Sequence, residues 1–310
     1  MVFESVHGGV KQRAASVSVM SNLVLTGSKL AAALVTGSVS VLSEALHSGL
    51  DLVAAMMAWF AVRRSRQPPD AEHRFGHGKF ESLSGLIEGL LIILAVVLIA
   101  NEAIRKILAG DVKVSVPALG IGVMGLSAVL NTFVSRMLFR VAKRTDSVAL
   151  EADAWHLSTD VWTSVGVFAG LGVIALSKSS LFAGTWFSRE AGHLDPIVAL
   201  LVAAVIFRAA WDITRRSWDH LVDRSLPREE IKRIEDLLLE HYPQVAQFHR
   251  LRTRKAGSQR QIDLHLVVPG DMSVAEAHQL CDHLEGDLRR LLPGSEVLIH
   301  VEPEADTDRA

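Results

Sequence analysis

The chain has 310 residues, 49% of them hydrophobic, and its mean hydropathy is +0.29. A formal net charge of −2 gives no support for nucleic-acid binding, which normally requires a basic surface. The only cysteine is Cys281, so the chain can form neither an internal disulfide nor a cysteine-based zinc site. Any metal must therefore be bound by His, Asp and Glu.

Apolar residues dominate from residue 14 to about residue 212, and the rest of the chain is mostly polar. Segments of roughly 20 apolar residues are long enough to span a bilayer. We therefore predict an α-helical membrane protein whose six transmembrane helices occupy residues 1–216. Lys29 lies within the first span, and we expect its long side chain to reach an interface. The six predicted spans are 14–36, 38–62, 82–107, 114–142, 148–177 and 195–216.

Lysine and arginine fall mainly on one side of these spans. They lie before the first span, between the second and third, and after the fourth. Because such residues favour the cytoplasmic side, we expect a multi-pass protein of the plasma (inner) membrane with both termini in the cytoplasm. The residues concerned are Lys11, Arg13, Arg63, Arg64, Arg66, Arg74, Lys79, Arg140, Lys143 and Arg144.

The polar part, residues 217–302, predicts a small cytoplasmic domain. Residues 261–266 alternate polar and apolar with the period of a half-buried strand. Ser273 and Glu276 have the spacing of a helix capping box. The expected elements are a helix over 227–241, strands near 246–254 and 260–268, a helix over 273–292 and a strand over 296–301. This αββαβ order indicates an α+β domain with its helices on one sheet face, followed by a disordered tail over 303–310.

Two identical ligand pairs lie deep in the second and fifth spans. His47 and Asp51 are four residues apart, as are His156 and Asp160, so each pair shares one helix face. The two spans run in opposite directions, and both pairs reach the bilayer middle. Two imidazoles and two carboxylates form a tetrahedral ligand set for a divalent transition metal. The alternative is a set of buried charge pairs that only holds the bundle together, but ionisable groups inside membranes are usually functional.

Other polar residues extend the faces of these helices. We interpret Glu44, Asp153 and Ser164 either as partners of the ligands or as residues that line the entry path. Glu88 in the third span and Asn131 in the fourth are more typical of contacts between helices.

Two further groups have metal-ligand chemistry. Asp70, His73 and His77 lie in the loop after the second span and can share one metal if a turn brings them together. The alternative is an ordinary solvated loop. The small domain carries a second group, for which scattered surface histidines are the alternative. Its members are His249, His265, His278, His300 and Glu302.

From about Lys29 to Glu302 the sequence resembles the cation diffusion facilitator family of metal/proton antiporters, particularly its bacterial zinc- and iron-efflux branch. The resemblance is carried by Thr-Gly-Ser-Val-Ser at 36–40, the two His-x-x-x-Asp pairs, His-Arg-Phe-Gly-His-Gly-Lys at 73–79, Asp-Arg at 223–224, Leu-Arg-Thr-Arg at 251–254 and Pro-Gly-Ser at 293–295. It implies that the intramembrane pairs are the transport site and that residues 70, 73 and 77 form a loop site.

The resemblance further implies a metallochaperone-like cytoplasmic domain with a regulatory, often binuclear, metal site at the five residues of the second group. It also implies a homodimer formed through that domain, with Lys79 and Asp223 tying the domain to the membrane helices. Position 47 is His where the branch often has Asp, which favours Zn²⁺ over Mn²⁺. Position 302 is Glu where Asp is more usual.

These observations predict a transporter that exports Zn²⁺ or a related divalent metal in exchange for protons, with the metal as substrate and as regulatory ligand. Fe²⁺, Cd²⁺, Co²⁺ and Ni²⁺ remain alternatives as substrates. A membrane-embedded metal sensor or buffer is the alternative function. We do not expect an enzyme: the chain has no His-Glu-x-x-His or phosphate-binding glycine loop, and a closed four-ligand site leaves no position for catalysis.

Overall fold

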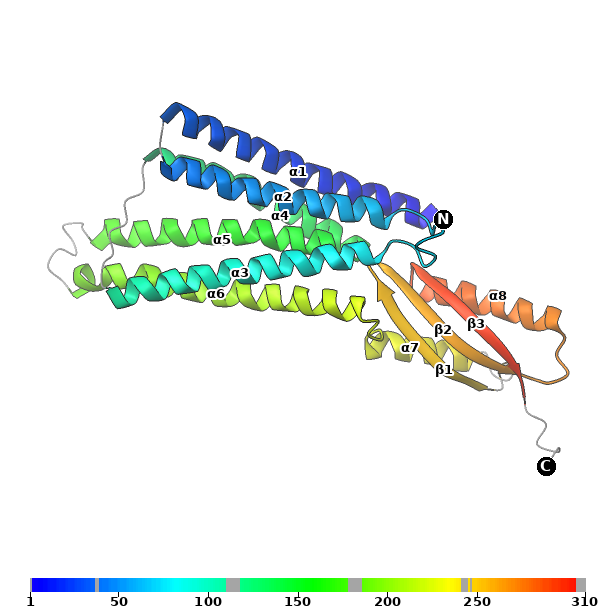
Figure 1. The fold of residues 1–310 in the computed structure, drawn as a ribbon. Coiled ribbons are helices and arrows are strands. Elements are labelled where there is room, and N and C mark those ends of the chain that lie inside the picture. Colours follow the sequence, from blue (N-terminus) through cyan, green and yellow to red (C-terminus); the bar gives the residue numbers. More distant parts are fainter. Residues whose placement is uncertain are drawn as a thin grey trace.

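The computed structural model describes residues 2–36, 39–109, 118–177, 186–240, 245 and 247–304. Six long helices form a bundle, and a small domain with a three-stranded sheet lies at one end of it (Figure 1). The bundle helices are α1 (Val2–Thr36), α2 (Val39–Ser65), α3 (Lys79–Ala109), α4 (Ala118–Thr145), α5 (Val148–Ser177) and α6 (Trp186–Leu221). The predicted six-helix bundle followed by a small α+β domain is confirmed.

The bundle exposes apolar side chains and buries several ionisable ones. Leu46, Leu90 and Leu98 are exposed, whereas Asp51 and Glu88 are buried. That distribution suits a protein surrounded by lipid. Within the described residues, four stretches are long and apolar enough to cross a membrane; they are Gly8–Val35, Ala45–Ser65, Lys79–Arg105 and Pro196–Leu221.

Several helices extend beyond the predicted spans. α1 begins at Val2 rather than near residue 14, and α6 begins at Trp186 rather than near 195 and continues to Leu221. Apolar runs mark the part of a helix that lies in lipid, but polar residues continue a helix equally well. The expected domain boundary at 216 therefore lies inside α6.

Small residues bring α3 and α6 close together. A Cβ atom on Gly89 would lie 2.3 Å from Thr214 Oγ1, and one on Gly85 would lie 2.7 Å from Ser217 Oγ. Glycine and hydroxyl residues allow two membrane helices to approach closely, so dispersion forces between their backbones stabilise the pair.

The small domain packs two helices against its sheet. Its elements are α7 (Arg228–Glu240), β1 (Gln247–Ala256), β2 (Gln259–Val268), α8 (Val274–Leu291) and β3 (Ser295–Pro303). The sheet order is β1-β2-β3, with β1 and β2 antiparallel and β2 and β3 parallel. Ile234 of α7, Leu284 of α8 and Leu264 of β2 share its core. The capping box of Ser273 and Glu276 is confirmed. The β3 strand includes Pro303, and residues 305–310 of the expected tail lie outside the described residues.

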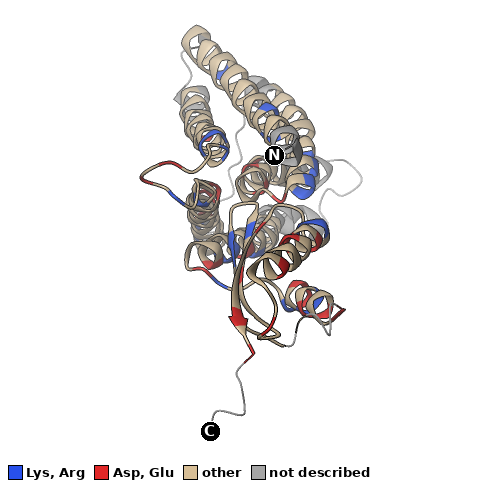
Figure 2. Ribbon diagram, turned by 90° about the vertical axis from the view of Figure 1, so that its right-hand side faces the viewer, with Lys and Arg blue, Asp and Glu red and all other residues tan. Residues whose placement is uncertain are grey.

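The β1–β2 turn rests on the start of α3. A Cβ atom on Gly78 would lie 2.4 Å from the carbonyl oxygen of Ala256. Nearby, Lys79 Nζ lies 2.9 Å from one Asp223 oxygen, and Arg254 lies 3.2 Å from the other. Burial favours the neutral acid, but the hydrogen bond and charge of Lys79 hold the pKa of Asp223 below its usual value. Figure 2 shows charged residues gathered on the small domain and on the adjacent helix ends and loops.

Candidate metal sites

The intramembrane cluster consists of His47 and Asp51 on α2 and His156 and Asp160 on α5. His156 Nε2 lies 3.1 Å from Asp51 Oδ1, and His47 Nε2 lies 4.0 Å from Asp160 Oδ1. Each histidine is therefore beside the aspartate of the other helix. This crossed pairing follows from two His-x-x-x-Asp motifs at similar depth on helices that run in opposite directions.

The spacing of these ligand atoms suits a small divalent cation. Zinc bonds to nitrogen and oxygen are about 2.0–2.2 Å long, so tetrahedral ligand atoms lie about 3.3–3.6 Å apart. Ligand atoms of His47, Asp51 and Asp160 all lie within 4.8 Å of one another, and His156 joins them through Asp51. Side-chain rotations that shorten these distances would bring the groups to the spacing of zinc ligands.

Burial differs between the two halves of the cluster. The side chains of Asp51 and His156 are 6% and 18% exposed, whereas those of His47 and Asp160 are 60% and 24% exposed. Because α2 runs toward the small domain and α5 runs away from it, the buried half lies nearer that domain. The accessible half of the cluster is therefore the half farther from the small domain.

Two neighbours of the cluster have roles that the sequence pattern describes incompletely. Asn131 of α4 joins helices as predicted, but it does so by donating to Asp160 Oδ2 at 3.3 Å. The prediction that Lys29 reaches an interface is wrong. Lys29 is only 6% exposed, and its Nζ donates to Ser48 Oγ at 2.7 Å. A hydroxyl acceptor on the polar face of α2 draws this ammonium into the bundle.

The flanking acids are deeply buried. Glu88 and Asp153 are 0% and 1% exposed, and Ser84 donates to Glu88 at 3.1 Å. Ser164, one turn beyond Asp160, is also buried. The side chain of Glu44 lies outside the described residues.

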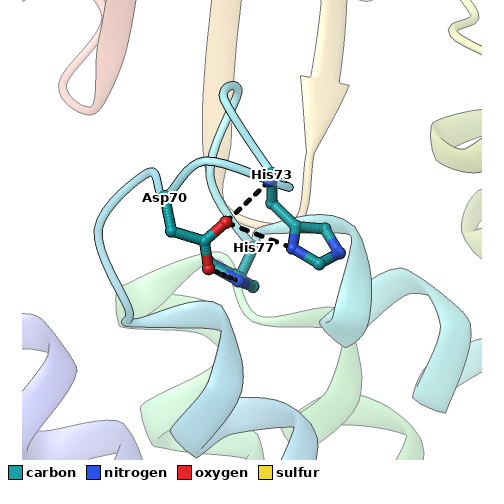
Figure 3. Close-up of side chains that lie close together, drawn as sticks. All are labelled: Asp70, His73 and His77. Atoms are coloured by element: carbon teal, nitrogen blue, oxygen red, sulfur yellow. Dashed lines mark hydrogen bonds and ion pairs between the residues drawn. The ribbon is translucent and has the colours of Figure 1, made fainter.

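The loop cluster of Asp70, His73 and His77 comes together in a tight turn between α2 and α3 (Figure 3). Asp70 Oδ1 accepts from the backbone N–H of His73 at 2.7 Å, and this bond lowers the pKa of the Asp70 carboxyl. His77 Nε2 lies 3.2 Å from the carboxylate, and His73 Nδ1 lies 3.4 Å from it. Both of these ring nitrogens are buried and lack a hydrogen bond, so they fit a metal held with Asp70.

The strand cluster of His249, His265, His300 and Glu302 crosses all three strands. His265 on β2 is in register with His249 on β1 and with His300 on β3. Glu302 Oε1 lies 2.8 Å from His265 Nδ1, and Oε2 lies 3.2 Å from His249 Nε2. The hydrogen bond from His265 lowers the pKa of the Glu302 carboxyl. The four side chains form one open, partly exposed ligand set.

A backbone irregularity lies beside this cluster. The β1–β2 register shifts between His249 and Arg252, and Arg250 has a positive φ of 51°. A β-bulge of this kind redirects side chains at a strand edge. His278 is not brought to the strand cluster within this chain; it is exposed on α8, where its nearest acidic group is Asp282 at 3.8 Å.

A buried polar network at the small-domain end of the bundle has no counterpart in the sequence pattern. Glu81 of α3 is 1% exposed and accepts from Lys11 at 2.9 Å, Ser65 at 2.9 Å and Ser147 at 2.5 Å. Lys11 also donates to Ser258, in the β1–β2 turn, at 2.8 Å. In the sequence, Lys11 is only one of several basic residues that precede or follow a predicted span. Its partners Glu81 and Ser258 are far away along the chain, so no local pattern indicates these contacts.

Two family descriptions match the chain. Residues 15–222 match "Cation efflux transmembrane domain", and residues 226–304 match "Cation efflux protein, cytoplasmic domain". The chain belongs to the cation diffusion facilitator family. This is a family of cation-efflux transporters rather than of enzymes, and its cytoplasmic domain is a dimerisation domain.

Individual relatives and one solved domain are similar to this chain. The cation-efflux pump FieF of Yersinia pestis is 35% identical, over 95% of this chain and 93% of its own length. An uncharacterized transporter of Synechocystis sp., sll1263, is 37% identical, over 94% and 90%. The metal-bound C-terminal domain of the CzcD transporter from Thermotoga maritima is 32% identical, with a TM-score of 0.24, and covers 27% of this chain and 100% of that one.

Proposed function

We propose that this protein exports a divalent transition-metal cation, chiefly Zn²⁺, in exchange for protons, and that the intramembrane cluster binds the transported ion. The crossed pairing of His47 with Asp160 and of His156 with Asp51 carries the proposal, since it gathers four ligands from two antiparallel helices. A set of two nitrogen and two oxygen ligands favours Zn²⁺ over the harder Mn²⁺.

Proton exchange follows from the chemistry of these ligands. An imidazole binds metal when neutral and a carboxylate when ionised, so metal and protons compete for the same atoms. When the cluster faces the cytoplasm, the metal displaces protons. When it faces a more acidic exterior, protonation of His47 and His156 releases the metal. Rocking of the helices around a fixed midplane site supplies alternating access.

The orientation is part of the proposal. The N-terminal part of α1 and the small domain lie at the same end of the bundle, where Lys11 bonds Ser258 at 2.8 Å. The concentration of Lys and Arg at this end supports a cytoplasmic location for both termini in the inner membrane. The exposed half of the intramembrane cluster then faces outward.

The loop and strand clusters are proposed to bind regulatory metal. The unbonded nitrogens of His73 and His77 and the convergence of His249 and His265 on Glu302 support this role. Metal at the strand cluster would tighten a homodimer formed through the cytoplasmic domain and raise transport. His278 remains a proposed ligand of this regulatory site.

Flux measurement tests the transport role. Proteoliposomes that contain a zinc-sensitive dye are given a pH gradient, and zinc uptake is compared between the native protein and an Asp51→Ala plus Asp160→Ala variant. We expect gradient-driven uptake by the native protein and none by the variant. Uptake by the variant would defeat the site assignment. A protein that only senses or buffers metal would bind Zn²⁺ and carry no flux. Parallel assays with Fe²⁺, Cd²⁺, Co²⁺ and Ni²⁺ test the choice of ion.

A further inference from the structure

A buried cation lies next to the intramembrane cluster. Lys29 belongs to α1, within the membrane-spanning stretch Gly8–Val35, and is only 6% exposed. Lysines in membrane helices normally extend to an interface, because an ammonium in hydrocarbon is costly. Here Nζ instead donates to Ser48 Oγ at 2.7 Å, on the neighbouring helix.

The position of Ser48 directs this charge toward the proposed metal ligands. Ser48 follows His47 directly and lies one turn before Asp51. α1 is held in register by a second contact, in which Thr26 Oγ1 donates to the Ser48 carbonyl oxygen at 2.8 Å. The ammonium of Lys29 also interacts electrostatically with the Asp160 carboxylate on α5. Lys29 therefore contacts α2 directly beside the proposed ligand His47 and interacts with the proposed ligand Asp160 of α5.

The charge balance indicates what this lysine does. Ionised Asp51 and Asp160 with protonated Lys29 have a net charge of minus one, and a bound divalent ion changes it to plus one. Without the lysine, the two positive charges of the same ion would balance the two negative charges of Asp51 and Asp160. In an interior of low dielectric constant, such a fixed positive charge weakens binding of a second cation considerably.

We propose that Lys29 is a tethered counter-ion that partly neutralises the empty cluster and lowers its affinity for the divalent ion. A lower affinity allows the ion to dissociate faster, so Lys29 weakens metal binding and speeds metal release. This inference rests on the transport role proposed above. It assigns Lys29 a positioning and affinity-setting role, since the ammonium opposes the ion and does not coordinate it.

Lys29→Met tests the inference, because methionine keeps most of the side-chain length and removes the charge. In the zinc-uptake assay with dye-containing proteoliposomes at about pH 8, where ligand protonation contributes least, we expect the KM for Zn²⁺ to fall by about tenfold or more. The maximal rate should fall by a similar factor, because a tighter-bound ion leaves more slowly. Lys29→Arg keeps the charge and should stay near the native values.

Controls separate this effect from loss of fold and from failure of the transport role. Lys143→Met removes an exposed charge in the last turn of α4 and should change neither constant. If Lys29→Met does not fold, Lys29→Gln, which keeps a donor for Ser48, takes its place. Zinc binding by detergent-solubilised full-length protein is measured in parallel, counting only the portion abolished by Asp51→Asn.

The outcomes are distinct. Tighter binding together with slower flux supports the inference. Tighter binding in a protein that carries no flux supports the role of Lys29 and overturns the transport proposal. Unchanged or weaker binding in the uncharged variants overturns the inference, whatever the flux of the native protein.

Discussion

The intramembrane cluster and the strand cluster use the same kinds of ligand, but the backbone segments that carry these ligands are connected differently. The first takes its ligands from two separate helices, joined across the gap by His156–Asp51 and His47–Asp160. The second takes them from three hydrogen-bonded strands, where neighbours are held about 4.8 Å apart. Helices can separate and release an ion, whereas adjacent strands keep their spacing. The difference fits the roles proposed for them, transport for the first cluster and retention of a regulatory metal for the second.

Removing a carboxylate from the intramembrane cluster should have the largest effect. Asp51→Asn keeps the shape of the side chain but leaves His156 without its anionic partner. We expect zinc flux in proteoliposomes to fall by about a hundredfold or more, since even partners of metal ligands are worth 10- to 100-fold. Asp212→Asn, at an exposed position of α6, is the matched control. Near-native flux in Asp51→Asn would contradict the assignment of transport to the intramembrane cluster.

A smaller loss is expected from the residue that orients Asp160. Asn131→Ala removes the hydrogen bond to Asp160 Oδ2 while keeping all four proposed ligands. We expect about a tenfold drop in zinc flux. Asn101→Ala, at an exposed position of α3, should remain near native. Equal flux in the two variants would show that Asp160 needs no support from α4.

The strand cluster should respond differently. His265→Ala removes the central ligand of the cluster, so we expect fewer Zn²⁺ bound per chain at equilibrium. Transport should fall by about fivefold, the lower end of the range for coupling between distant sites. His283→Ala, an exposed histidine of α8 outside the cluster, is the control. Complete loss of flux in His265→Ala would indicate that the strand cluster belongs to the transport path.

The pH dependence of the strand cluster should show no contribution from its carboxylate. The hydrogen bond from His265 holds the pKa of Glu302 below its usual value of 4.5. This contact is therefore complete above that value and is lost only as pH falls through the lower folded-state pKa. Protonation of Glu302 should therefore not release zinc from this cluster between about pH 7 and 5.

Glu302→Gln tests this assignment. The variant should bind zinc more weakly, but the slope of log Kd against pH between about pH 7 and 5 should match that of the native protein, because this slope counts the protons that compete with the metal. The measurement is the equilibrium Kd for zinc of the full-length protein across this pH range. A shallower slope in Glu302→Gln would assign part of the titration to Glu302.

Periodic patterns in the sequence determined much of this protein. Apolar runs located the membrane helices, and alternation at residues 261–266 located β2. The i, i+4 spacing placed each His–Asp pair on one helix face, because local backbone geometry sets which side chains are neighbours. These features depend only on residues close together along the chain.

Tertiary structure alone decided what each charged side chain meets. Lys29 and Lys11 are ordinary basic residues in the sequence, yet one reaches Ser48 on α2 and the other reaches Glu81 on α3. The bulge at Arg250 and the distance of His278 from the strand cluster likewise depend on strand pairing and helix packing. A long side chain can satisfy its charge in many directions, and only the folded arrangement of acceptors selects one.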